Sequence, residues 1–267
     1  MPFLESLLGG SLLAGLQSTE RRGIVFGALD ATLGFGGLPQ SATGQTTLLT
    51  GRNGAEIMNG HYGPWPGPTL KRVLDESTLF SEVLASGGRV AFANAFPPGY
   101  FTALSEGKQK VNVPVYAAQR AEVPLLTLED YRAGRAISAD LDGGYLKDPQ
   151  PLPEAGARLA RLAQDAELTF FDFWLSDTAG HRWAFADAVA LVERLDSFIS
   201  GLVPRLGEVT LLLTSDHGNL EDKSTRSHTR HPVPLLVVGS AAHFFAGATG
   251  LLEVAPCLRR ALALGTT

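Results

Sequence analysis

The chain has 267 residues, of which 45% are hydrophobic and 18% are charged. This length fits one large α/β domain, or a core with a small insertion, and the composition is too apolar for a disordered chain. The 22 basic and 27 acidic residues give a net charge of −5, which argues against non-specific nucleic-acid binding through a basic face. The single cysteine, Cys257, excludes an internal disulfide and a cysteine-based zinc cluster.

The chain opens with an apolar stretch, residues 1–16. This stretch has no positively charged start, carries Glu5 and contains glycines, so a short amphipathic helix at Pro2 to Leu8 is favoured over a signal peptide. No run reaches the roughly 18 apolar residues that a membrane helix needs. We therefore expect a soluble, cytoplasmic protein that makes no membrane contact.

Helical and strand patterns alternate along the rest of the chain. Strands with near-continuous apolar sequence are expected at 89–95, 168–175, 209–214 and 234–239. Helices are expected at 78–86, 154–165, 184–200 and 251–264. Continuous apolar strands alternating with helices indicate an α/β fold whose mainly parallel sheet is covered by helices on both faces.

The middle of the chain, residues 97–153, is richer in proline, glycine and charge. It holds one short run of alternating apolar residues at 110–117, KVNVPVYA. We interpret it as a small cap inserted between two parts of one α/β core, 1–96 and 154–267.

Polar residues that could bind a metal collect beside the predicted strands, and in open α/β sheets ligands bind beyond the carboxyl ends of the strands. In the stretch SDTAGH, Asp177 and His181 are four residues apart, within reach of one metal ion if the segment turns. Asp offers a hard oxygen and His an imidazole nitrogen. The alternative is a helix-capping Asp with an incidental His.

The stretch TSDHGN directly follows the predicted strand at 209–214. Its adjacent Asp216 and His217 suit two metal ligands at a strand end, and Gly218 permits a tight turn. The alternative is an ordinary polar turn, because Asp and Gly favour turns in any case.

The stretch SHTRHPVPLL places His228 and His231 just before the last predicted strand. Two surface histidines are the alternative here. Most of the six histidines of the chain lie in or beside these three stretches, which makes a chance origin for all three hard to accept.

A fourth stretch, LPQSATGQTTLLTGR at 38–52, is similar to a phosphate-binding loop, but its glycine spacing is wrong and Gln45 stands where that loop needs Lys. A hydroxyl nucleophile at the start of a helix fits better, since helix N-termini favour anions. Ser41 or Thr43 could be that hydroxyl. The alternative is a capped helix without chemistry.

These motifs together resemble those of the alkaline phosphatase superfamily, above all the branch that holds cofactor-independent phosphoglycerate mutase and phosphopentomutase. That branch has D-x-x-x-H, D-H-G and H-T-x-x-x-V-P motifs, which read here as Asp177–His181, Asp216–His217–Gly218, and His228–Thr229 through Val233–Pro234. The family's nucleophile lies ten residues before the glycine that here is Gly51, which selects Ser41 over Thr43. The resemblance covers residues 38–96 and 154–239.

The resemblance implies two divalent metal ions, Mn²⁺ or Zn²⁺, and a phosphoserine intermediate at Ser41. The implied ligands are Asp177, His181 and His228 for one ion, and Asp216, His217 and the Ser41 oxygen for the other. Arg52 is a candidate phosphate contact, with a plain surface arginine as the alternative. His231 is expected to support the site from outside or to lie on the surface.

The chain departs from the family at its start. The family opens with an apolar strand that ends in an Asp-Gly pair, and that Asp binds the second metal. Asp30, the only Asp before Ser41, does not end an apolar strand of the expected kind. We therefore expect that the chain lacks the family's true first strand, that its sheet is incomplete, and that the second metal site is weak.

The cap also differs from the family, because 97–153 is far smaller than the insertion of the phosphoglycerate mutases. A mutase must keep its product sequestered from water, so a cap this small makes hydrolysis as plausible as transfer. A sulfatase is disfavoured, since Ser41 is not followed by the required Pro and Arg. The resemblance thus implies an enzyme that hydrolyses or transfers the phosphate of a small phosphorylated metabolite. A true phosphomutase acting on phosphoglycerate or phosphopentose, and a catalytically degenerate ligand-binding protein, are the alternatives.

Overall fold

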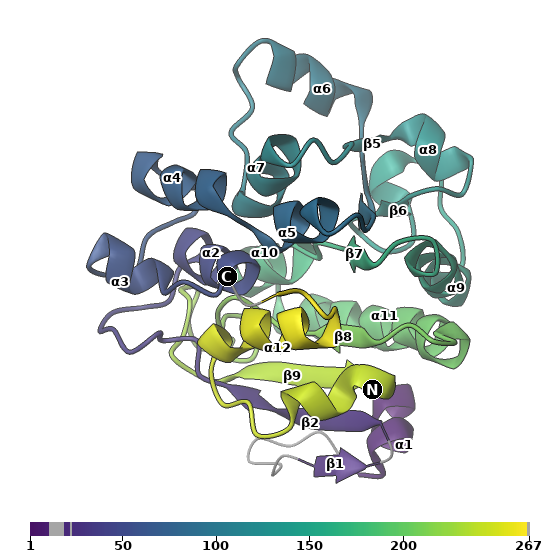
Figure 1. Cartoon of the computed structure of the whole chain (residues 1–267). Helices are drawn as coiled ribbons and strands as arrows, with labels where there is room; N and C mark the ends of the chain where they lie inside the picture. Colours follow the sequence, from purple (N-terminus) through teal and green to yellow (C-terminus); the bar gives the residue numbers. More distant parts are fainter. Residues whose placement is uncertain (11–18, 22, 266–267) are drawn as a thin grey trace.

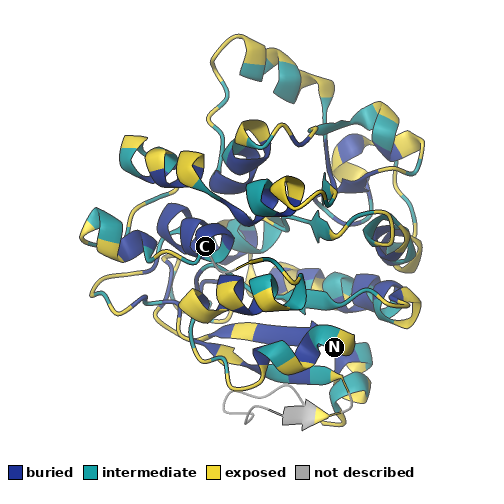
Figure 2. Cartoon of the chain, viewed as in Figure 1, coloured by how far each residue is buried: buried dark blue, intermediate teal, exposed yellow. Residues whose placement is uncertain are grey.

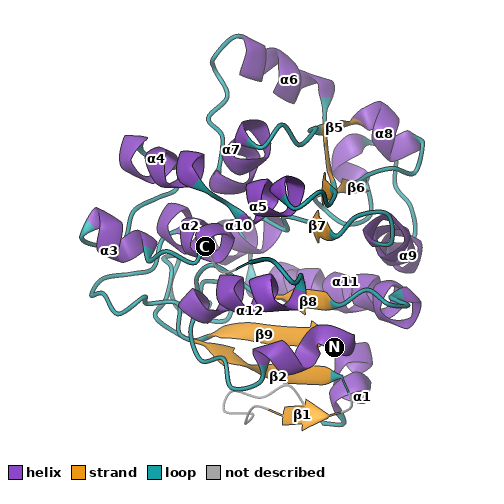
Figure 3. Ribbon diagram, in the orientation of Figure 1, coloured by secondary structure: helices purple, strands orange, loops and turns teal. Residues whose placement is uncertain are grey.

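Helices and strands alternate along the chain and pack as an α/β fold (Figures 1 and 3). The structure is a computed structural model that describes residues 1–10, 19–21 and 23–265. Its strands are β1 (Thr19–Arg21), β2 (Ile24–Leu29), β3 (Val90–Phe92), β4 (Asn94–Phe96), β5 (Leu126–Thr127), β6 (Ile137–Ser138), β7 (Leu168–Phe170), β8 (Leu211–Leu213) and β9 (Val233–Val238). Its helices are α1 (Pro2–Leu8), α2 (Ser41–Thr50), α3 (Gly54–Met58), α4 (Pro68–Glu76), α5 (Leu79–Ala85), α6 (Pro98–Ser105), α7 (Val113–Arg120), α8 (Leu128–Arg132), α9 (Leu152–Ala163), α10 (Leu175–Arg182), α11 (Phe185–Leu202) and α12 (Val254–Ala261).

The α/β class predicted from the sequence is confirmed, and so are the helices α1, α5, α9 and α11. The alternating run at 110–117 does not form a strand. Helix α7 begins there at Val113, because the side chain of Asn112 accepts the backbone N–H of Val115 and caps the helix. Part of the apolar opening stretch, residues 11–16, lies outside the described residues.

The largest sheet has the strand order β1-β2-β9-β8, and every neighbouring pair in it is antiparallel. The expectation of a mainly parallel sheet is therefore wrong for this sheet. Parallel pairing is found between β3 and β7, and between β4 and each of β5 and β6. An apolar run in the sequence indicates that a strand is buried on both faces. The direction of the strand depends instead on the chain segments that connect it to its neighbours.

Strand β9 is one of the two inner strands of the large sheet, and most of its residues are buried (Figure 2). Leu235 and Val237 pack into one hydrophobic cluster, which also contains Val254 and Cys257 of α12. Leu236, between them, packs into a second cluster with side chains of α9 and α11. The sheet thus lies between α12 on one face and the α9–α11 pair on the other.

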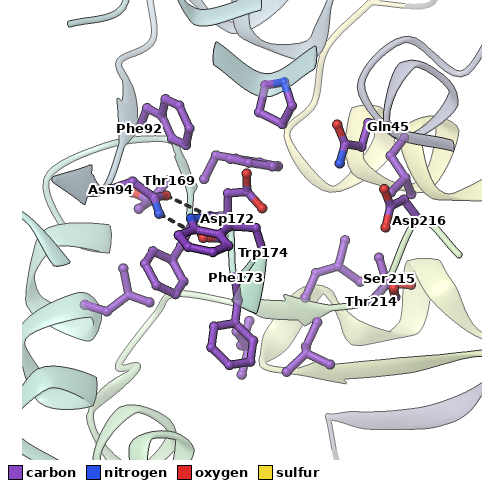
Figure 4. A pocket seen from close by; sticks show the side chains of 18 of the residues that line it. Gln45, Phe92, Asn94, Thr169, Asp172, Phe173, Trp174, Thr214, Ser215 and Asp216 are labelled. Carbon is purple, nitrogen blue, oxygen red and sulfur yellow. Dashed lines mark hydrogen bonds between the residues drawn. The ribbon is translucent and has the colours of Figure 1, made fainter. Parts of the chain in front are cut away.

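One cavity of about 1700 Å³ separates the large sheet from the β3–β7 pair. Both β7 and β8 line it, and among the described strands β7 pairs with β3 alone and β8 with β9 alone. Figure 4 shows Thr169 and Asp172 on one side of this cavity and Thr214 and Asp216 on the other. Because Ser41 lines the same cavity, the fold directs the start of α2 into it.

The segment 97–153 lies toward the top of Figure 1, and Tyr100, Asn112 and Tyr145 of this segment line the cavity. Its two short strands, β5 and β6, pair on either side of β4, a strand of the preceding segment. The division into a core and a cap stays a prediction. Among the described helices, even α11, the longest, is not apolar enough for its length to cross a bilayer.

We predict that Asp196→Ala detaches α1 and lowers the free energy of unfolding by about 1–3 kcal/mol, because two buried N–H groups lose their acceptor. The carboxylate of Asp196 lies on α11, is 4% exposed, and accepts the backbone N–H groups of Phe3 and Leu4, each at 2.9 Å. Denaturant unfolding of the purified protein measures the change. Glu193→Ala, an exposed position on the same helix, is the control, and an equal loss in both variants would contradict this role.

Candidate metal centre and nucleophile

Four separate parts of the fold deliver the candidate side chains to one place. Helix α10 carries Asp177 and His181 one turn apart, so both project from the same face. The loop after β8 supplies His217 beside Asp216, and the loop before β9 supplies His228. Helix α2 begins with Ser41 at its first residue.

The three imidazoles gather around the carboxylate of Asp177. Its Oδ1 atom lies 3.3 Å from His181 Nε2, 3.4 Å from His228 Nε2 and 3.9 Å from His217 Nε2. The rings of His217 and His228 stack with centroids 3.7 Å apart, and the two Nε2 atoms of His181 and His228 are 3.1 Å apart. The group of Asp177, His217 and His228 offers ligand atoms within 4.8 Å of one another.

Each imidazole is oriented by a backbone carbonyl on its Nδ1 side. His228 Nδ1 lies 2.7 Å from the carbonyl oxygen of Pro39, and His181 Nδ1 lies 2.5 Å from that of Arg226. His217 Nδ1 makes a longer contact of 3.4 Å to the carbonyl of Gly218. Because a carbonyl oxygen only accepts, Nδ1 carries a proton, so Nε2 is the ring nitrogen that faces the cluster. A protonated Nε2 can donate to Asp177, and an unprotonated one offers its lone pair to a cation.

Asp177 is ionised at neutral pH. Burial by itself raises its pKa, but hydrogen bonds from His228 and Asn219 and the nearby His217 and His181 outweigh burial and lower the pKa to about 2. Asn219 Nδ2 donates to Asp177 Oδ1 at 2.7 Å. An oriented carboxylate with unprotonated imidazole nitrogens is a donor set that suits a divalent transition metal.

Asp216 brings a second carboxylate to the same region. Its Oδ1 atom lies 3.7 Å from His217 Nε2, and its Oδ2 atom is buried without a hydrogen-bond partner. Helix α2 passes directly against this residue, because a Cβ atom at Gly44 would overlap the carbonyl oxygen of Asp216. A buried carboxylate oxygen without a partner fits a cation ligand, since an unpaired buried charge is otherwise costly.

The hydroxyl of Ser41 joins the cluster directly, with Oγ 3.0 Å from His217 Nε2. Thr43, the other candidate nucleophile, is fully buried, and its hydroxyl donates to the carbonyl of Gln40 at 2.9 Å. The structure therefore brings Ser41 to the cluster and turns Thr43 away from it. The place of Ser41 at a helix N-terminus also favours binding of an anion beside it.

Three other candidates lie outside the cluster. Arg52 follows the opposite end of α2 and forms an ion pair with Glu76, so the structure does not bring it to Ser41. His231 is more than half exposed, and its Nδ1 lies 3.3 Å from Glu221. Asp30 does follow an apolar strand, β2, but it is exposed and its carboxylate accepts the N–H and hydroxyl of Thr32.

Several supporting residues were not singled out from the sequence. Asn219 holds Asp177, and Glu221 accepts both the Asn219 N–H and the Thr229 hydroxyl, which ties the two histidine-bearing loops together. Asp172 lines the cavity near the end of β7, where burial and the charge of Asp216 raise its pKa to about 7 against a hydrogen bond from Asn112. Asn219 lies within the TSDHGN stretch, but the sequence does not indicate that it binds Asp177.

Comparison with known proteins adds an independent finding. Residues 153–264 match the family model described as the metalloenzyme superfamily. The 2,3-bisphosphoglycerate-independent phosphoglycerate mutase of Pseudomonas entomophila is 34% identical over 131 residues, which are 44% of this chain and 26% of that protein. The enzyme of the same name from Aliivibrio fischeri is 41% identical over 91 residues, 31% of this chain and 18% of that protein. The chain thus spans 26% or less of the length of these two relatives.

Solved structures show the fold over the whole chain. Alkaline phosphatase from the Antarctic bacterium TAB5 aligns with 99% of this chain and 94% of its own length, at a TM-score of 0.56 and 12% identity. A mutant of that enzyme with Mg bound aligns over the same shares at a TM-score of 0.59 and 11% identity. At such low identity the likeness establishes an alkaline-phosphatase-like fold and nothing further.

We predict that His228→Ala weakens the binding of Mn²⁺ or Zn²⁺ more than about 100-fold, because a direct ligand should matter more than the residues that merely orient it. His231→Ala, at the exposed position beside Glu221, should weaken it by no more than about 10-fold. Elemental analysis after metal loading and dialysis measures both variants. Loss of metal from the His231 variant alone would reverse the assignment of the two histidines.

Proposed function

Because residues 153–264 form a metalloenzyme-superfamily domain, we propose that this chain carries a site of metal-dependent phosphoryl transfer with Ser41 as its nucleophile. The observation that carries the proposal is the 3.0 Å contact of Ser41 Oγ with His217 Nε2, since His217 belongs to the same candidate metal group as Asp177 and His228. The names of the relatives, phosphoglycerate mutase and alkaline phosphatase, support phosphate esters as the substrate class.

In this proposal two divalent ions are held by the clustered side chains. Asp177, His181 and His228 hold one ion, and Asp216, His217 and the Ser41 oxygen hold the other. Bound divalent ions would lower the pKa of the serine hydroxyl and neutralise charge on the phosphate oxygens. Oxygen and nitrogen donors without sulfur suit manganese or zinc.

The residues of the chain perform the remaining tasks. The Ser41 hydroxyl loses its proton to solvent, and its Oγ attacks the phosphorus atom. The bond from phosphorus to the ester oxygen breaks, that oxygen leaves with its organic group and takes up a proton from solvent, and the phosphoryl group stays on Ser41. The positive end of α2 stabilises the anion next to it. The carbonyls of Pro39 and Arg226 keep the imidazoles of His228 and His181 in one orientation throughout. Water or a substrate hydroxyl then takes the phosphoryl group from Ser41.

We predict that Ser41→Ala lowers the turnover of p-nitrophenyl phosphate with Mn²⁺ by about 10³-fold or more, as removal of a covalent nucleophile does. Stability should change by less than about 1 kcal/mol, because Gln40 and not Ser41 is the N-cap residue of α2. Release of nitrophenol and thermal unfolding are the two measurements.

Thr43→Val is the matched control, because it removes the other candidate hydroxyl and keeps the side-chain shape. It should retain turnover. Loss of turnover in the Thr43 variant with activity kept in the Ser41 variant would refute the assignment. Metal binding without any turnover in the unmodified chain would instead support a ligand-binding protein.

Hydrolysis and transfer are separated by the fate of the phosphate. Hydrolysis of a sugar phosphate releases inorganic phosphate in proportion to substrate consumed. A phosphomutase moves phosphate between hydroxyls of the substrate with no such release. Phosphate release and ³¹P NMR of the product, measured in one reaction, distinguish them.

A further inference from the structure

Three aromatic side chains, Tyr100, Tyr145 and Trp174, line the cavity that also contains Ser41 and Asp177. We refer to these three residues as the aromatic wall. The rings of Tyr145 and Trp174 meet edge to face, with centroids 6.1 Å apart. Burial, with a further contribution from the nearby Tyr145, raises the pKa of Tyr100 to about 12, so its hydroxyl stays neutral. The wall therefore presents uncharged aromatic surface to the cavity.

Each ring of the aromatic wall is held by local contacts, and one of the three, Trp174, adjoins a helix that carries part of the metal cluster. Trp174 is the N-cap residue of α10, the helix that carries Asp177 and His181, and Figure 4 shows Trp174 beside Asp172 in the cavity. The backbone N–H of Tyr145 donates to Asp140 Oδ2 at 2.5 Å, which orders its turn. Tyr100 packs on Phe96 with ring centroids 4.4 Å apart. These contacts order the three rings before a ligand binds.

Three aromatic side chains that line the cavity are exposed to solvent, and no described residue covers their exposed area. Tyr145 is 49% exposed and Trp174 is 41% exposed, and a third exposed ring, Trp65 at 40%, lines the same cavity. Large aromatic groups left open in a concave site are typical of ligand-binding surfaces, because ligand binding removes their apolar area from water. Three of the exposed aromatic side chains thus line the cavity that also contains the candidate nucleophile.

The charges around the cavity select against an anionic organic group. Among the described residues that line it, Lys110 is the one Lys or Arg, whereas Asp172, Asp177 and Asp216 all contribute carboxylates. The negative charge of the substrate phosphate would itself neutralise the positive charge of the bound cations. A substrate that carries a further carboxylate would find Lys110 as the one cationic side chain among these residues and several carboxylates that repel it, which costs affinity.

We propose that the phosphate ester recognised at this site carries an uncharged aromatic ring, which stacks on the aromatic wall while the phosphate lies at the metal cluster. This inference rests on the proposed function and adds the chemical class of the organic group. It also distinguishes this chain from an enzyme for phosphoglycerate, whose organic part is a carboxylate.

Non-hydrolysable phosphonates test the inference, because they report affinity without the chemistry of the leaving group. Ethylphosphonate, benzylphosphonate and 2-carboxyethylphosphonate are titrated calorimetrically into the Mn²⁺-loaded full chain. Benzylphosphonate should bind about 10-fold more tightly than ethylphosphonate, the size expected for one stacked ring. The carboxyethyl compound should bind no better than ethylphosphonate.

Variants assign that difference to the wall. Trp174→Ala and Tyr145→Ala should each remove most of the advantage of benzylphosphonate and leave ethylphosphonate affinity unchanged, and Trp174→Phe should keep the advantage. Phe185→Ala is the control, because Phe185 is 70% exposed and lies outside the cavity lining. A fall in affinity for all three compounds in the Trp174 variant would mean a purely structural role and would overturn the inference.

The two proposals fail in different ways. If ethylphosphonate does not bind the metal-loaded chain, the proposed function fails and the aromatic subsite falls with it. If ethylphosphonate binds in a metal-dependent manner but benzylphosphonate binds no better, or the carboxyethyl compound binds best, only the aromatic inference is overturned.

Discussion

The convergence of three imidazoles on the Asp177 carboxylate is the interaction on which the candidate site depends. A carboxylate ionised at neutral pH and partly buried needs compensation, and it receives it from Asn219 and from His228, His217 and His181. The imidazoles are in turn held by backbone carbonyls, so their orientation follows from the path of the main chain. A donor set arranged in this way loses little freedom when a cation binds, which favours affinity.

Close packing of helices α2 and α10 brings these side chains together. Gly44 lets α2 lie directly against Asp216, and a Cβ at Gly180 of α10 would overlap the side chain of Asn219. These two contacts bring α2 and α10 against the loop after β8. The large sheet, buried on both faces, provides the rigid base from which the loops after β8 and before β9 extend.

The cavity combines two different surfaces. At the cluster it is lined by carboxylates and imidazole nitrogens, and along β7, β8 and the aromatic wall it is largely apolar. A phosphate ester with an aromatic organic group has the same division between a charged end and an apolar end. Trp174 precedes Asp177 by three residues at the start of α10, so the two surfaces meet at one helix terminus.

The sequence by itself determined the α/β class, helices such as α9 and α11, and the residue types of the site. Periodicity and local spacing carry this information, because Asp177 and His181 share a helix face whatever surrounds them. Only the tertiary structure decided the antiparallel direction of β9, the stacking of His217 on His228, and the contact of Ser41 with His217. It also placed Arg52 beside Glu76 rather than at the cluster. These features depend on contacts between residues far apart in the chain and on backbone carbonyls, whose positions no side-chain pattern records.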